Sequence, residues 1–141
     1  MNQIAVALSP PTGNVIAVGI DLAHVSAVRG SIDQFGARYL DRIFTPAEQA
    51  QCAESSDPSS HLAARFAAKE AAIKALMIED GPIPPWTSIE VQRQPAGVCR
   101  LHLTGAAARI ADEKGIDGLI VSLSHEADMA IAIVLATTKN M

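Results

Sequence analysis

The first half of the chain combines one short apolar run with several segments in which apolar residues follow a helical spacing. The β-branched run Val15–Ile20 is typical of a buried strand, and Asp21 follows it directly. Apolar residues three and four positions apart predict a helix over Ser31–Arg42. The segment Thr45–Glu48 predicts the start of another helix. Thr45 is suited to cap the helix N-terminus, the proline that follows is suited to the first helical position, and Glu48 completes a capping box. The alanine-rich segment Ser60–Met77 has no Gly or Pro and predicts the longest helix.

The second half changes to strands after the proline-rich break Gly81–Pro85, which cannot continue a helix. Thr104 is expected to cap a short helix that Gly115 ends. Four strands are predicted around that helix: Ser88–Arg93, Val98–Leu103, Leu119–His125 and Met129–Ala136. The pattern predicts an α+β fold, one compact domain with a helix-rich first half and an antiparallel sheet in the second half. We expect a leader over residues 1–14, the domain over 15–136 and a C-terminal tail over 137–141.

Composition excludes several classes of protein. A length of 141 residues suits one domain, and 49% hydrophobic residues suffice for a core. The net charge of −4 argues against a nucleic-acid partner, because phosphate neutralisation requires a basic surface. The two cysteines, Cys52 and Cys99, form no metal-binding or disulfide pattern. No apolar run is long enough to span a bilayer and no secretory signal opens the chain, so we expect a cytoplasmic protein with no membrane partner.

Three groups of residues could carry chemistry, and Asp21 is the first. A carboxylate at the end of a buried strand is a common metal ligand or catalytic acid. Gly19, two residues earlier, would allow another backbone to approach closely. The alternative is that Asp21 only caps the next element, as Asp often does.

The second group lies on the long predicted helix. Arg65 and Lys69 share one face, whereas Glu70 and Lys74 share another that points in a different direction around the helix axis. Glu70 and Lys74 also have the spacing of an ordinary solvated ion pair. The rest of the segment is alanine and large apolar residues, however, so the few charges are expected to face each other, a ligand or a partner chain.

The third group is the segment Val121–Glu126. Strand alternation places His125 on the same face as Val121 and Leu123, and Ser124 on the opposite face. A lone histidine is more often structural than catalytic. The chain also has no nucleophile elbow, Walker loop or GxGxxG loop, so this group taken alone leaves the function open.

In chain order, the three groups resemble the holo-acyl-carrier-protein synthases, the small group of 4′-phosphopantetheinyl transferases. The resemblance rests on Gly19-Ile20-Asp21, on Arg65-Phe-Ala-Ala-Lys69-Glu70-Ala-Ala-Ile-Lys74 and on Val121-Ser-Leu-Ser124-His125-Glu126. The middle segment is the most specific, and the likeness runs from about Val15 to Ala136. It implies transfer of the phosphopantetheine arm of coenzyme A to a serine of an apo acyl carrier protein, as in fatty acid biosynthesis. Adenosine 3′,5′-bisphosphate would be the other product.

The resemblance implies a role for each candidate residue. Asp21 and Glu70 would hold Mg²⁺, and Glu70 would also help to take the serine proton, directly or through a metal-bound water. Lys74 would neutralise the leaving phosphate and complete the catalytic set of Asp21, Glu70 and Lys74. Four residues would bind coenzyme A: Arg65, Lys74, Ser124 and His125.

The resemblance also implies a homotrimer with active sites at subunit junctions. Because the two charged faces of the long helix point in different directions, we expect each site to take the catalytic set from one subunit and Ser124 and His125 from the next. Two other functions remain open at this point. One is a Mg²⁺-dependent hydrolase of nucleotide pyrophosphates that uses the same carboxylates on water. The other is a catalytically silent assembly domain of the same fold. The carrier, from fatty-acid or polyketide synthesis, and the preference for Mg²⁺ over Mn²⁺ are open as well.

This chain departs from the family where the carrier is bound. Many members have Glu three residues and Arg six residues after the first Asp, where this chain has His24 and Ala27. Arg29, Arg38 and Arg42 could instead form the basic patch that meets an acidic carrier.

Overall fold

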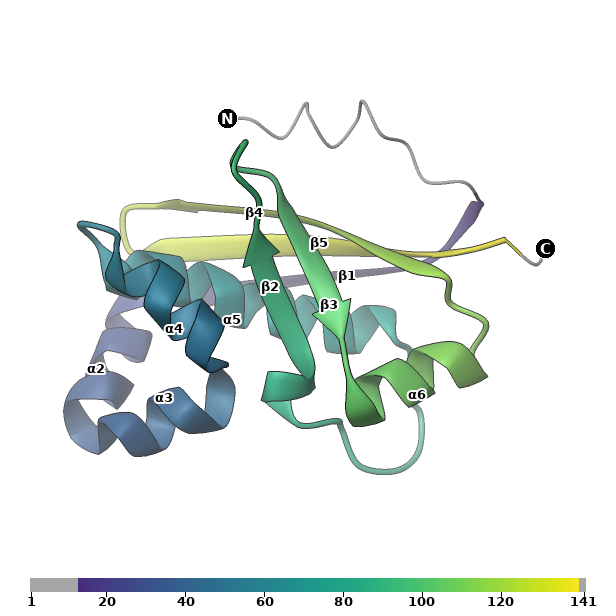
Figure 1. Cartoon of the computed structure of the whole chain (residues 1–141), viewed down its shortest axis with the longest axis horizontal. Helices are drawn as coiled ribbons and strands as arrows, with labels where there is room; N and C mark the ends of the chain where they lie inside the picture. Colours follow the sequence, from purple (N-terminus) through teal and green to yellow (C-terminus); the bar gives the residue numbers. More distant parts are fainter. Residues whose placement is uncertain (1–12, 140–141) are drawn as a thin grey trace.

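A three-stranded antiparallel sheet packs against one long helix in the computed structural model, which describes residues 13–139 (Figure 1). These elements are β1 (Asn14–His24), β4 (Gly118–Glu126), β5 (Met129–Thr138) and α5 (Pro58–Ala75). The strands lie in the order β1–β5–β4, and β5 is antiparallel to both neighbours. The helix α5 packs on all three strands, and mainly on β1 and β5.

Four short helices, a 3₁₀ turn and a β-hairpin complete the fold. They are α2 (Val25–Phe35), α3 (Ala37–Ile43), α4 (Pro46–Ala53), the 3₁₀ turn η1 (Trp86–Ser88), β2 (Ile89–Arg93), β3 (Cys99–Leu103) and α6 (Gly105–Glu113). In Figure 1, α2, α3 and α4 gather at one end of the molecule, and α6 lies toward the other. The hairpin β2–β3 forms a separate two-stranded sheet, and its strand β3 lies beside β4.

Small residues let β1 and α5 approach each other closely. Seven alanines of α5 are at most 1% exposed: Ala63, Ala64, Ala67, Ala68, Ala71, Ala72 and Ala75. Gly19 of β1 lies against this helix, and a Cβ built on it would be only 1.9 Å from the carbonyl oxygen of Ala71. The close backbone approach expected at Gly19 is therefore confirmed, and it holds the residues that follow Gly19 against α5.

Most predicted elements are confirmed, and the differences have local causes. The α+β fold is confirmed, with β1 from the first half completing the sheet as an edge strand. Thr45 begins α4 with a complete capping box, as predicted. The prediction of one helix over Ser31–Arg42 is wrong, because Gly36, at a φ of 57°, ends α2 and precedes α3. Thr104 precedes α6, but its side chain makes no capping hydrogen bond.

The strands extend slightly beyond residues 15–136, since β1 begins at Asn14 and β5 reaches Thr138. Residues 1–12 of the expected leader and residues 140–141 of the expected tail lie outside the described residues. The division into leader, domain and tail stays a prediction. Between residues 13 and 139, no helix is long and apolar enough to cross a membrane.

Candidate active site

Asp21, Glu70 and Lys74 come together where β1 crosses α5. The Lys74 ammonium donates a hydrogen bond to the Ile20 carbonyl at 3.0 Å and lies 3.8 Å from Oδ1 of Asp21. Asp21 pairs with the buried Ala132 of β5, so its side chain is on the sheet face that α5 covers. Glu70 is one helical turn before Lys74 and therefore shares the same face of α5. The structure thus brings together the three residues predicted to be catalytic.

The two carboxylates of this cluster influence each other. Burial, and then the neighbouring Asp21 carboxylate, raise the pKa of Glu70 to about 7, although Lys74 acts in the opposite direction. A divalent cation between the carboxylates would relieve this repulsion, and carboxylate oxygens suit Mg²⁺. Within residues 13–139, no group of three or more His, Cys, Asp or Glu side chains is placed to hold a metal. A cation at this cluster would therefore take its remaining ligands from substrate oxygens and water.

Arg65 and His125 belong to a second cluster, toward the beginning of α5. Their common neighbour is His61, whose ring meets the His125 ring edge to face with centroids 5.3 Å apart. Burial lowers the pKa of His61, and the positive charges of His125 and Arg65 add to this effect. His61 and Glu70 are nine residues apart on α5, which is about 13 Å along the helix axis at 1.5 Å per residue.

Arg65 is 2% exposed and only partly satisfied by the chain itself. Its terminal nitrogen donates to Oε1 of Gln51 at 2.7 Å, whereas its buried Nε has no hydrogen-bond partner among the described residues. A buried donor without a partner is costly, and a ligand oxygen would remove that cost.

A cavity of about 620 Å³ lies beside this second cluster. It is lined by Gln51, Glu54, Ser55, His61, Arg93, Gln94 and Pro95. Its size is within the usual range for small-molecule sites, and its charged lining residues are Arg93 and Glu54. The cavity is therefore large enough for a small-molecule ligand, to which Arg93 could offer a positive charge.

The structure does not bring Ser124 and Lys69 into either cluster. Ser124 lies on the outer face of the sheet, opposite to His125 and in register with the exposed Ile131, which confirms the predicted alternation. Lys69 is fully buried, with Nζ 2.8 Å from Oε1 of Glu48. It also donates to the carbonyls of Trp86 at 3.0 Å and Ile89 at 2.5 Å. Lys69 therefore joins α5 to α4, η1 and β2 in the core.

Sequence reasoning missed His61 and Arg93. His61 is four residues before Arg65, so its position on the same helix face was available as a signal. Arg93 had no such signal, because only the packing of the β2–β3 hairpin beside α4 brings it to the cavity.

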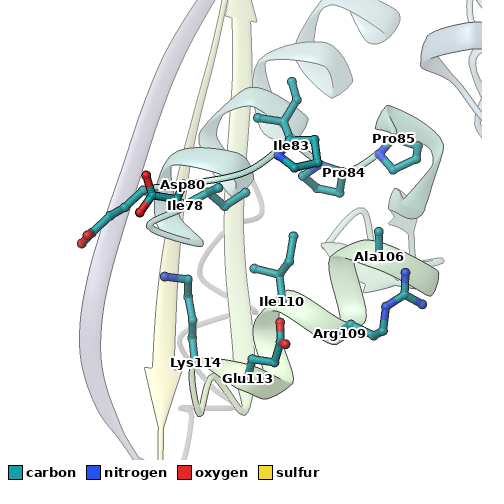
Figure 2. Close-up of a pocket in the computed structure, with 12 residues that line it drawn as sticks. Ile78, Asp80, Ile83, Pro84, Pro85, Ala106, Arg109, Ile110, Glu113 and Lys114 are labelled. Carbon is teal, nitrogen blue, oxygen red and sulfur yellow. The ribbon is translucent and has the colours of Figure 1, made fainter.

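A further cavity of about 640 Å³ separates the proline-rich segment 78–85 from α6 (Figure 2). Ile83 borders it from the segment, whereas Arg109, Ile110 and Glu113 border it from α6. None of the predicted site residues lines this cavity, so we place the candidate active site at the two clusters along α5.

Paired carboxylates beside a lysine, with a buried arginine along the same helix, are features of enzymes that act on phosphate-containing substrates. The model of the 4′-phosphopantetheinyl transferase superfamily matches residues 17–134. A holo-[acyl-carrier-protein] synthase of Desulforudis audaxviator is 41% identical over 122 residues, which cover 86% of this chain and 92% of that protein. One of Chloroflexus aggregans is 42% identical over 129 residues, 84% of this chain and 92% of that protein.

Solved structures of holo-[acyl-carrier-protein] synthases have the same fold as this chain. The holo-[acyl-carrier-protein] synthase of Neisseria meningitidis has a TM-score of 0.80 at 27% identity, covering 89% of this chain and all of that one. The Helicobacter pylori enzyme, solved in complex with coenzyme A, has a TM-score of 0.74 at 29% identity, covering 85% of this chain and 99% of that one. The chain belongs to the 4′-phosphopantetheinyl transferase superfamily, which confirms the resemblance inferred from its motifs.

Proposed function

We propose that this chain transfers the 4′-phosphopantetheine arm of coenzyme A to a serine hydroxyl of an apo acyl carrier protein and releases adenosine 3′,5′-bisphosphate. The observation that carries the proposal is the convergence of Asp21, Glu70 and Lys74 where β1 crosses α5. The names of the curated relatives, and the complex of the Helicobacter pylori enzyme with coenzyme A, support the same reaction.

The chemistry assigns one task to each residue of the cluster. Asp21 and Glu70 would hold Mg²⁺, which when bound neutralises charge on the pyrophosphate of coenzyme A. Glu70 is suited to accept the serine proton as the serine oxygen forms its bond to phosphorus. The ammonium of Lys74 is suited to neutralise the leaving phosphate, which departs with the electron pair of the broken P–O bond.

The second cluster would hold the far phosphate and nucleotide of coenzyme A. Arg65 offers its unpaired buried Nε, and His125 with His61 borders the same region. The neighbouring cavity has room for a ligand of nucleotide size. We assign Lys74, Arg65 and His125 to coenzyme A on this basis, and Ser124 through the assembly described next.

We further propose that the protein is a homotrimer with active sites at the subunit junctions. The outer face of the sheet carries apolar side chains that are between 40% and 57% exposed: Val15, Val18, Ile20, Leu22, Ile131 and Ile133. An apolar face of this extent is typical of a surface covered by another subunit. Ser124 lies on the same face, so a neighbour seated there would be within its reach.

The shared site makes a direct prediction about mixed assemblies. Each site would take Asp21, Glu70 and Lys74 from one subunit, and Ser124 and His125 from the next. Glu70→Gln and His125→Ala are each expected to be nearly inactive. Hybrid trimers, formed by unfolding and refolding the two together, should recover a fraction of wild-type activity. Hybrids verified by native mass spectrometry that stay as inactive as either parent would contradict the shared site.

The carrier would dock on α3. Arg38 and Arg42 line one groove there, whereas Arg29 lies outside it, with its guanidinium 4.0 Å from the Asp57 carboxylate. We therefore narrow the expected basic patch to Arg38 and Arg42. His24, at the position where many family members have Glu, lies 3.6 Å from Asp128 within the chain.

The test of the proposed reaction is the intact mass of a panel of apo carriers after incubation with coenzyme A and Mg²⁺. A suitable carrier should gain about 340 Da, the mass of the arm that phosphoryl chemistry transfers. A chelator should abolish the gain, and added Mg²⁺ should restore it. Release of free 4′-phosphopantetheine without any carrier would indicate a hydrolase instead, and no reaction at all would indicate an assembly domain. Cytoplasmic location and a role in fatty acid biosynthesis stay predictions.

A further inference from the structure

Gln51 lies where three elements meet around the cavity of about 620 Å³ beside the second cluster. It belongs to α4, whereas His61 lines the cavity from α5 and Arg93 lines it from the end of β2. Gln51 lines the cavity and also contacts Arg65, which is almost fully buried. Gln51 thus connects the buried Arg65 to the cavity.

Both polar atoms of the Gln51 amide are engaged. Its Oε1 accepts a hydrogen bond from a terminal nitrogen of Arg65 at 2.7 Å and a longer one from the Arg93 backbone amide at 3.4 Å. Its Nε2 donates to the Arg93 carbonyl at 3.1 Å. A guanidinium can only donate and a backbone carbonyl can only accept, so a glutamine amide satisfies both neighbours in this one orientation. The backbone of β2 therefore fixes Gln51, and Gln51 fixes the plane of the Arg65 guanidinium.

One side of the Arg65 guanidinium stays available. Its Nε is buried and has no hydrogen-bond partner among the described residues. A buried donor without a partner costs free energy, and a phosphate oxygen bonded to Nε would remove that cost. Guanidinium groups bind phosphate through parallel N–H groups, so the orientation of the plane determines whether phosphate oxygens can meet it.

The phosphate group that remains for this cluster is the 3′-phosphate on the ribose of coenzyme A, because the reacting pyrophosphate is assigned to Asp21, Glu70 and Lys74. We propose that Gln51 is a positioning residue for Arg65: it holds the guanidinium so that Nε meets an oxygen of this 3′-phosphate. This inference rests on the proposed function. Gln51 acts through Arg65 and takes no part in the transfer of the phosphopantetheine arm.

Gln51→Met keeps the length of the side chain and removes its hydrogen bonds. The Kd for coenzyme A, measured by titration calorimetry with Mg²⁺ present, should rise about tenfold, the usual effect of losing a hydrogen bond to a charged group. At saturating coenzyme A, kcat should stay within about twofold of wild type, because the reacting groups lie in the other cluster. A fall in kcat with an unchanged Kd would overturn the inference.

Dephospho-coenzyme A, which lacks the 3′-phosphate, distinguishes the positioning of Arg65 from a general distortion of the cavity. The wild-type chain should bind it more weakly than coenzyme A. Gln51→Met should bind it as tightly as the wild type does, because the phosphate that Arg65 meets is already missing. Equal losses of affinity for the two ligands in Gln51→Met would indicate a distorted cavity and would overturn the inference.

Gln49→Met is the matched control, because Gln49 is a glutamine of the same helix whose amide also makes two hydrogen bonds. Its Nε2 donates to Oδ1 of Asp41 at 3.0 Å and to the Phe44 carbonyl at 3.1 Å. Gln49 is not among the residues that line the cavity. Its substitution should leave the Kd for coenzyme A within about twofold of wild type. An equal rise in Kd for Gln49→Met and Gln51→Met would show an effect of α4 as a whole and would contradict the specific role of Gln51.

Gln51→Glu provides the test if Gln51→Met does not fold. Its carboxylate still accepts from Arg65, but it cannot donate to the Arg93 carbonyl and its negative charge competes with the phosphate for the guanidinium. The Kd for coenzyme A should again rise about tenfold or more, with little change for dephospho-coenzyme A.

The outcomes for the inference and for the proposed function are separable. A wild-type chain that binds no coenzyme A would overturn both. A wild-type chain that binds coenzyme A but modifies no carrier would overturn the proposed reaction, whereas the calorimetry would still decide the role of Gln51. Unchanged affinity for coenzyme A in a folded Gln51→Met or Gln51→Glu variant would overturn the inference alone.

Discussion

Replacing Gly19 by alanine tests whether the close contact of β1 with α5 builds the site. The new Cβ would lie 1.9 Å from the Ala71 carbonyl oxygen and 3.0 Å from the Ala75 amide nitrogen, both of them backbone atoms. Ordinary contact begins at 3.4 Å, so the strand and the helix would have to separate by about 1.5 Å. Asp21 is two residues further along the strand and would move away from Lys74 and Glu70 with it.

The expected cost has a structural and a catalytic part. Overpacking of this kind destabilises a fold by about 1–3 kcal/mol, which urea unfolding measures. Displacement of a reacting group by about 1 Å lowers turnover roughly 100-fold, so kcat should fall by about that factor in protein that is still folded.

Gly30→Ala is the matched control, because a Cβ at this helical glycine of α2 meets nothing within 4 Å. It should stabilise the protein by about 0.5–1 kcal/mol and leave kcat unchanged. A Gly19→Ala variant with wild-type stability and wild-type kcat would refute the view that this contact positions Asp21.

Three further predictions concern charged groups. Asp21→Asn and Glu70→Gln should each lose most turnover, with a thermal transition within a few degrees of wild type, and a variant that unfolds instead would indicate a structural role. Arg38→Glu and Arg42→Glu should raise KM for the carrier and weaken the dependence of kcat/KM for the carrier on salt, with KM for coenzyme A unchanged. Unaltered carrier kinetics would indicate that the carrier docks elsewhere. The raised pKa of Glu70 means that the folded state binds a proton more tightly than the unfolded chain does. With a chelator present, the free energy of unfolding should therefore fall as pH rises from about 4.5 to 7, and it should fall less in Glu70→Gln. Urea midpoints measured across this pH range test the prediction. Identical pH profiles for the two proteins would contradict the raised pKa of Glu70.

The cluster of Asp21, Glu70 and Lys74 could be predicted from the sequence because short-range patterns determine it. Asp21 follows a strand and Glu70 and Lys74 share a helix face, so only the packing of that strand on that helix was needed to join them. Gly19 supplied the evidence for this packing. The helix break at Gly36 was missed, because apolar residues keep helical spacing on both sides of it.

The second cluster and the buried network of Lys69 depend on contacts between distant segments. The motif around Lys69 suggested a site residue. Its partners come from α4, η1 and β2, however, and no local sequence pattern predicts these contacts. Local spacing predicts which residues share a face of a helix or strand. Tertiary packing determines which residues of other elements that face contacts, and the local sequence does not show this.

The most direct measurement of the central claim is a paired product assay on the wild-type chain with one apo carrier, coenzyme A and Mg²⁺. Peptide mapping should locate a gain of about 340 Da on a single serine of the carrier, as expected for one transferred phosphopantetheine arm. Adenosine 3′,5′-bisphosphate should appear in equal amount, and neither product should form with Glu70→Gln. Coenzyme A cleaved while every carrier of the panel keeps its mass, or a modified carrier in equal yield with Glu70→Gln, would contradict the account.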